Sequence, residues 1–84
     1  MKKVINGKMY NTDTAEMIYS LPSWKDTGHD MYKKKTGEFF IYCWSKWSGH
    51  EPHIEPLTEE RAKELCEVYL DGDEYEEVFG KVEE

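Results

Sequence analysis

The chain has only two cysteines and no apolar run long enough to cross a membrane. At the N-terminus, turn residues Asn6 and Gly7 follow just two apolar residues, which does not fit the pattern of a secretory leader. We therefore expect a cytoplasmic protein with no membrane partner, in which Cys43 and Cys66 stay reduced.

Signatures of catalysis are also missing. The chain has no phosphate-binding loop, dinucleotide fingerprint or nucleophile elbow. Cys43 and His50 can be nominated as a nucleophile and its base, but Cys43 lies among apolar residues, where a thiol behaves as a small hydrophobic group. We expect no enzymatic activity and no catalytic residues.

Aromatic and acidic residues are abundant. Eighty-four residues make one domain, spanning residues 1–84, and twelve Trp, Tyr and Phe give its small core a large area per side chain. Residues 1–48 hold eight lysines and five acidic residues, whereas residues 49–84 hold three basic and thirteen acidic residues. The net charge of −7 therefore comes from the C-terminal half. Such a field disfavours direct binding of nucleic acid and suits a basic protein surface.

Two hairpins are predicted. The Asn-Gly pair between two short apolar segments favours a two-residue turn, with strands at about residues 3–11. A second, longer hairpin is predicted over residues 30–47. Its second strand is apolar on both faces, which indicates a central strand with both faces covered. Residues 48–56 are expected to form a loop.

A helix is predicted between the two hairpins. Thr12 or Asp13 can cap it, and Pro22 stops it after about Ser20. The residues on its apolar face would be Ala15, Ile18 and Tyr19.

Two further helices are predicted near the C-terminus. Thr58 caps the first, and Gly72 in a left-handed conformation ends it. Asp73 caps the second, with Glu76 completing a capping box, and a frayed tail follows at residues 80–84. The expected fold class is α+β: a short hairpin, a helix, a longer antiparallel hairpin, and two C-terminal helices packed on one small sheet.

Four residues have the composition of a structural zinc site. Cys43, His50, His53 and Cys66 make a Cys₂His₂ set, although their spacing is not that of a usual zinc finger or ribbon. Cys66 also belongs to the apolar face of a predicted helix, where a structural thiol would lie in any case. A structural zinc ion is therefore one hypothesis, and two plain core thiols are the other.

The acidic residues of the C-terminal helices form a candidate partner-binding surface. Solvation and favourable helix-dipole charges explain the first-turn carboxylates, but few cations balance the total. We expect Trp47, which lies beyond the alternating strand and next to Ser48-Gly49, to be exposed and to contact a partner. The acidic candidates are Glu59, Glu60, Glu64, Glu67, Asp71, Asp73, Glu74, Glu76 and Glu77.

An alternative binding mode involves aromatic residues close to lysines in the second hairpin. Interleaved aromatic and basic side chains can bind single-stranded nucleic acid. Aromatic residues on a strand of a small domain are more often core, and the net charge opposes this alternative. The residues concerned are Trp24, Phe40, Tyr42, Trp44 and Trp47, with Lys33, Lys34, Lys35 and Lys46.

Four blocks of the chain resemble a family of small acidic proteins encoded by phages and mobile elements of Gram-positive bacteria. The blocks are KVINGKMYNTDTA at residues 3–15, YKKKTGEFF at 32–40, PLTEERAK at 56–63 and DEYEEVFG at 73–80. Some small acidic phage proteins of this kind are anti-CRISPR proteins. The segment from Trp44 to His53 departs from the family, because it is short and its histidines, with Cys43 just before it, are not associated with the family at large.

The resemblance implies a stoichiometric inhibitor of an RNA-guided nuclease that acts in the cytoplasm of the host bacterium. Our leading hypothesis is a monomer or weak dimer that presents carboxylates of residues 59–84 to a basic groove of the nuclease, mimics DNA and blocks loading of nucleic acid. The alternatives are a phage accessory protein that binds another host protein, and a small zinc-stabilised interaction module.

Overall fold

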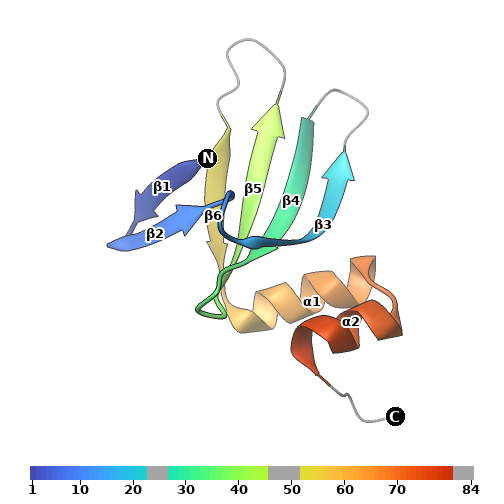
Figure 1. The fold of residues 1–84 in the computed structure, drawn as a ribbon. Helices are drawn as coiled ribbons and strands as arrows, with labels where there is room; N and C mark the ends of the chain where they lie inside the picture. The colour runs from blue at the N-terminus through green and yellow to red at the C-terminus, as the bar shows by residue number, and fades with distance from the viewer. Residues whose placement is uncertain (23–26, 46–51, 81–84) are drawn as a thin grey trace.

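The protein has an α+β fold with a four-stranded sheet, a separate two-stranded ribbon and two helices (Figure 1). The computed structural model describes residues 1–22, 27–45 and 52–80. All strand pairs are antiparallel, and the larger sheet has the order β3-β4-β5-β6. The elements are β1 (Lys2–Ile5), β2 (Lys8–Asn11), β3 (Glu16–Pro22), β4 (Thr27–Lys33), β5 (Phe39–Ser45), β6 (His53–Leu57), α1 (Glu59–Tyr69) and α2 (Gly72–Phe79).

The predicted N-terminal hairpin is confirmed as the β1–β2 ribbon. Asn6 and Gly7 have φ values of 52° and 77°, the positive angles that a type I′ turn requires at both central positions. Tyr10 anchors the ribbon to the larger sheet, because its ring meets Phe40 edge to face with centroids 5.4 Å apart.

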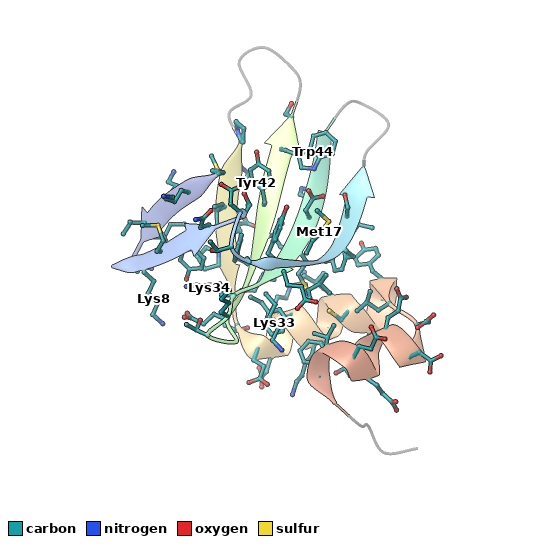
Figure 2. The ribbon with its side chains drawn as sticks, in the orientation of Figure 1. Lys8, Met17, Lys33, Lys34, Tyr42 and Trp44 are labelled. Carbon is teal, nitrogen blue, oxygen red and sulfur yellow. The ribbon has the colours of Figure 1, made fainter. Side chains whose placement is uncertain are left out.

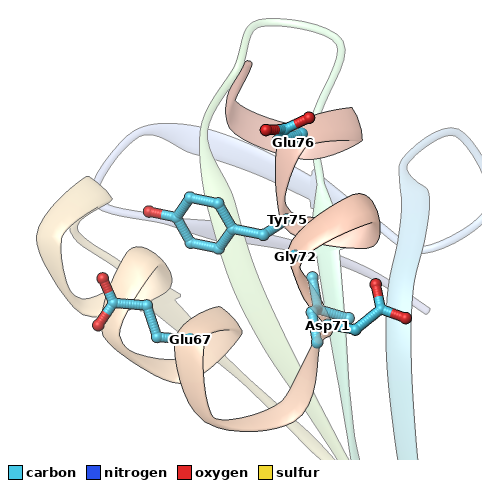
Figure 3. A pocket seen from close by; sticks show the side chains of 6 residues that line it. Glu67, Asp71, Gly72, Tyr75 and Glu76 are labelled. Carbon is cyan, nitrogen blue, oxygen red and sulfur yellow. The ribbon is translucent and has the colours of Figure 1, made fainter. Parts of the chain in front are cut away.

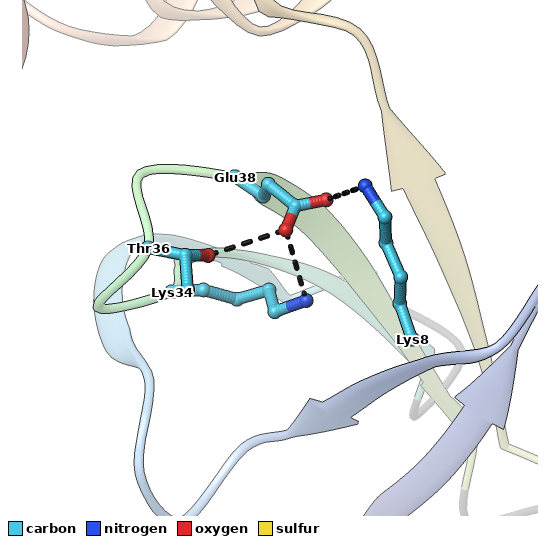
Figure 4. Close-up of polar contacts among 4 residues, drawn as sticks. All are labelled: Lys8, Lys34, Thr36 and Glu38. Atoms are coloured by element: carbon cyan, nitrogen blue, oxygen red, sulfur yellow. Dashed lines mark hydrogen bonds and ion pairs between the residues drawn. The ribbon is translucent and has the colours of Figure 1, made fainter.

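A polar contact also joins the ribbon to the turn between β4 and β5. Lys8 Nζ lies 3.0 Å from Glu38 Oε2, and Lys34 Nζ lies 3.4 Å from Glu38 Oε1 (Figure 4). The same Lys34 ammonium lies 4.1 Å from the centroid of the Tyr10 ring. The ribbon is therefore fixed to this turn by charge and to the sheet face by aromatic packing.

The segment predicted to be the first helix is the edge strand β3, so that prediction is wrong. Residues 11–15, just before β3, form a turn. The Asn11 side-chain oxygen accepts from the Asp13 N–H, and the Asn11 carbonyl accepts from the Ala15 N–H. The pairing of β3 with β4 then shifts register at Ile18, so that Ile18 and Tyr19 both pack against the same core cluster. This bulge puts two consecutive apolar residues on one side of the strand, whereas Ala15 packs against the other core cluster.

The second hairpin is confirmed, with strands β4 and β5, and β5 is central as predicted. β4 begins three residues earlier than expected, at Thr27. Phe39 and Ile41 belong to the core cluster under the helices, whereas Phe40 lies on the opposite face under the ribbon. Both faces of β5 are covered, which explains its lack of polar alternation.

Part of the segment predicted to be a loop is the edge strand β6, so the prediction for residues 53–56 is wrong. β6 pairs with β5 and places Pro56 opposite Phe40. An edge strand accepts proline because one side of its backbone has no neighbouring strand to receive an N–H. The prolines and histidines of residues 48–56 indicated a loop in the sequence, but residues 53–56 belong to a strand.

The helix α1 begins as predicted but ends differently. The Thr58 side chain caps it by accepting from the Arg61 N–H. Leu70 ends it in an extended conformation, with φ −108° and ψ 152°, so the prediction of a left-handed Gly72 is wrong. As the C-cap residue, Leu70 donates its N–H to the Cys66 carbonyl at 2.8 Å, and its partly buried side chain packs against the core cluster.

The capping box of α2 is two residues earlier than predicted. Asp71, rather than Asp73, accepts from the Glu74 N–H, and the Glu74 side chain accepts from the Asp71 N–H in return. Gly72 is consequently the first residue of the helix, and Gly80, with φ 90°, ends it.

The helices cover one end of the sheet (Figure 1). α1 contributes the fully buried Ala62 and Cys66, and Phe79 of α2 stacks on Phe39 with centroids 5.2 Å apart. Neither of the two helices that the structure describes is long and apolar enough to cross a membrane.

Candidate protein-binding surface

The nine acidic residues predicted to bind a partner all lie on α1, on α2 or at the junction between them, and all are exposed. We call them the acidic surface. Only Arg61 and Lys63 provide positive charge within α1 and α2. The fold therefore concentrates on one helix pair the negative charge that the sequence placed in the C-terminal half.

Part of this charge has a structural role. Glu59 pairs with Lys63 at 3.4 Å, and Glu64 pairs with Arg61 at 3.0 Å. Asp71 and Glu74 form the capping box described above. These carboxylates need no partner to explain them.

The rest of the charge has no such explanation. Among the described residues, the members of the acidic surface without an ion pair or a capping role are Glu60, Glu67, Asp73, Glu76 and Glu77. Glu76 and Glu77 lie in the last turn of α2, where the helix dipole is negative and a carboxylate is unfavourable. These two carboxylates therefore oppose the dipole of α2 instead of stabilising the helix.

Lys33 compensates the C-terminus of α2 from outside the helix. Its Nζ donates to the Val78 carbonyl at 3.1 Å and lies 5.6 Å from the centroid of the Phe39 ring (Figure 2). The last turn of α2 contains no basic residue, so β4 supplies the cation that the helix lacks. Sequence reasoning missed this contact because 45 residues separate its two partners.

A groove opens between α1 and α2 within the acidic surface. It has a volume of about 280 Å³ and is lined by Glu67, Leu70, Asp71, Gly72, Tyr75 and Glu76 (Figure 3). Leu70 and Tyr75 both line this groove, and no local signal in the sequence indicates that they do. The acidic surface therefore has an apolar depression at its centre.

The zinc hypothesis concerns residues that the structure brings together only in part. Cys43 of β5 lies opposite His53 of β6, whereas the Cys66 thiol donates to the Met31 sulfur at 3.6 Å in the core. Within residues 1–22, 27–45 and 52–80, no three His, Cys, Asp or Glu residues gather to hold a metal ion. His50 lies outside the described residues, so the four-residue zinc site stays a prediction.

The described aromatic residues of this candidate set, Phe40, Tyr42 and Trp44, are buried or partly buried. Phe40 is fully buried, and Trp44 is partly buried, with its Nε1 donating to Asp30 Oδ1 at 3.2 Å. Phe40 is therefore unavailable for stacking on a nucleic-acid base. Trp24 and Trp47 lie outside the described residues, so the predicted partner contact of Trp47 stays a prediction.

Comparisons with protein-family models, with curated proteins and with solved structures each gave no match.

Proposed function

We propose that this protein is a binding protein without catalytic activity, and that it docks the acidic surface of α1 and α2 on a basic surface of another protein. The observation that supports this most directly is the set of five carboxylates without an ion pair or capping role among the described residues, two of them opposed to the α2 dipole. A basic partner would relieve the repulsion among these carboxylates and would associate rapidly by electrostatic steering.

The partner that we propose is a bacterial RNA-guided nuclease. Such enzymes hold their nucleic acid in a positively charged channel and contact its backbone. Carboxylates on a rigid helix pair can occupy the positions of phosphates in that channel and so block loading of DNA. This choice of partner rests on the resemblance to small acidic phage proteins, whereas the acidic surface alone suits any basic host protein.

The test is binding to a purified RNA-guided nuclease, measured by calorimetry at several salt concentrations, together with its DNA cleavage. We expect stoichiometric inhibition and an affinity that weakens as salt rises, because screening acts on exposed charges. The variant with Glu60, Glu67 and Glu77 changed to Lys should lose binding and keep the circular dichroism spectrum of the wild type.

The control reverses charge elsewhere. Changing Lys2 and Lys3, exposed on the ribbon, to Glu should leave nuclease binding intact. Unchanged affinity of the Glu60, Glu67 and Glu77 variant at ~0.15 M salt would show that the acidic surface is not the binding site. Binding that follows the acidic surface but leaves cleavage unaffected would point instead to another host protein.

A further inference from the structure

We propose that the groove between α1 and α2 receives a single arginine side chain of the partner. This inference rests on the proposed function, because it assigns the chemistry that the centre of the acidic surface recognises. It adds a specific site to what is otherwise a general attraction between charges.

The groove has the size and the floor that a long side chain requires. Its volume of about 280 Å³ equals roughly nine water volumes at ~30 Å³ each. Leu70 and Tyr75 line it with apolar surface, on which the methylene stem of an arginine can lie. A shallow patch of carboxylates would attract a cation, but it would offer the stem nothing to pack on.

The charges of the groove favour a cation. Glu67 projects from α1 and Glu76 from α2, and Figure 3 shows the Tyr75 ring reaching from α2 toward Glu67. Neither Glu67 nor Glu76 has an ion pair among the described residues, and the described residues that line the groove include no Lys or Arg. A bound guanidinium would supply the charge that both carboxylates lack.

Arginine fits this arrangement better than lysine. A guanidinium is planar, carries five donors and stacks on an aromatic ring, so it can pair with carboxylate at the groove while it stacks on the phenol ring. An ammonium is a compact, strongly hydrated charge that gains less from the ring.

A second hollow in the same region provides a contrast. It lies between β3 and α2, has a volume of about 140 Å³ and is lined in part by Glu16, Glu74 and Glu77. Lys33 also lines it and supplies a cation there from the protein itself. The groove beside Tyr75 is larger and lacks such a cation among its described lining residues, which is why we assign the arginine to it.

The test is a nuclear magnetic resonance titration with N-acetyl-arginine N-methylamide at constant ionic strength. The matched probes are the corresponding lysine and citrulline amides, which change the shape of the cation or remove its charge. We expect the arginine probe to shift the backbone amides of Glu67, Gly72, Tyr75 and Glu76, with a dissociation constant on the order of millimolar for so small a ligand. The lysine probe should bind more weakly, and the citrulline probe should cause no shift.

Two double variants distinguish binding in the groove from general attraction to the negative charge of the acidic surface. Glu67→Gln with Glu76→Gln should weaken binding of the arginine probe on the order of fivefold, as expected for the loss of two partly screened ion pairs. Glu60→Gln with Asp73→Asn removes the same charge outside the groove and should change the affinity less than twofold. Equal losses in the two double variants, or equal binding of the lysine probe, would overturn the arginine assignment.

The outcome also distinguishes this inference from the proposed function. If the nuclease binds and both double variants weaken that binding equally, the acidic surface stands and the arginine site is wrong. If the arginine probe binds in the groove and the nuclease does not bind, the site stands and the proposed partner is wrong.

Discussion

The indole of Trp44 on β5 lies against the α-carbon of Gly28 on the neighbouring strand β4. A Cβ atom placed on Gly28 would overlap the Cζ2 and Cε2 atoms of that indole. From this position the indole Nε1 donates to Asp30 Oδ1 at 3.2 Å, and the Ser20 hydroxyl donates to the same oxygen at 2.6 Å. The missing side chain at residue 28 therefore lets the indole reach a buried carboxylate two residues along β4.

We predict that Gly28→Ala lowers the free energy of unfolding by about 2–4 kcal/mol, since it forces the indole away and breaks its bond to a carboxylate. The measurement is urea unfolding of the wild type and the variant. In a Trp44→Leu background, the same Gly28→Ala change should cost less than about 1 kcal/mol, because the ring is gone. An equal cost in both backgrounds would show that the contact with Trp44 is not the cause.

Tyr19 should make the fold sensitive to alkali. Burial, with a smaller contribution from nearby Cys66, raises the pKa of Tyr19 to about 12 from its ordinary 10.0. The folded state therefore keeps a proton that the unfolded chain releases, so this contribution is complete below pH 10 and is lost as pH rises from 10 to 12.

We expect unfolding free energy to fall across that window, with Tyr19 accounting for on the order of 1 kcal/mol after allowance for solvent around a partly buried hydroxyl. The measurement is urea unfolding at intervals from pH 9 to 12. Tyr19→Phe should have a shallower fall than the wild type. Parallel curves for the two proteins would contradict the assignment to Tyr19.

Glu38 should titrate below the usual range. The hydrogen bond from Lys8, opposed by desolvation and helped by Lys34, lowers the pKa of the Glu38 carboxyl from its ordinary 4.5. Its contribution to stability is therefore present above that ordinary value and is lost as pH falls through the lowered pKa. Side-chain carbon shifts measured against pH should show the lowered value directly.

Lys8→Met keeps a long, unbranched side chain and removes its charge, so the pKa of Glu38 should rise toward its ordinary value. Lys2→Met removes a lysine of the same ribbon that has no ion pair among the described residues, and it should leave the pKa of Glu38 unchanged. A pKa that responds equally to both variants would mean that net charge, rather than the contact with Lys8, sets it.

Both thiols should react slowly with thiol reagents in the native state. Cys66 is 0 % exposed and Cys43 is 9 % exposed, and burial raises the pKa of each thiol from its ordinary 9.0. We expect labelling by 5,5′-dithiobis(2-nitrobenzoic acid) to accelerate at least tenfold on unfolding in urea, since only the exposed thiolate reacts. Fast labelling of either thiol in the native state would contradict its burial.

The same assay tests the zinc hypothesis. A chelator should leave the labelling rate unchanged if packing alone protects the two thiols. Protection that disappears with a chelator, in a sample that carries about one zinc per chain, would support a metal site at Cys43, His50, His53 and Cys66.

Local signals predicted those elements whose structure depends on neighbouring residues. Asn6-Gly7 specifies its turn because both residues accept positive φ, and Thr58 caps α1 because its hydroxyl reaches an N–H three residues ahead. The apolar run around Phe40 also indicated correctly that β5 is central. The residues of the acidic surface could be predicted from the sequence, because they lie on successive turns of two neighbouring helices.

Tertiary structure decided where the same local pattern allowed two outcomes. Ile18 and Tyr19 fit one face of a helix, but pairing with β4 places them at the bulge of a strand. The backbone hydrogen bonds and packing gained with β4 outweigh the small differences in helix propensity. Leu70, the C-cap of α1, packs on the core, and Lys33 reaches α2 across 45 residues of sequence. The groove beside Tyr75 exists only once the two helices meet, so the sequence by itself determined the charge of the candidate site, and the packing of α1 against α2 decided its shape.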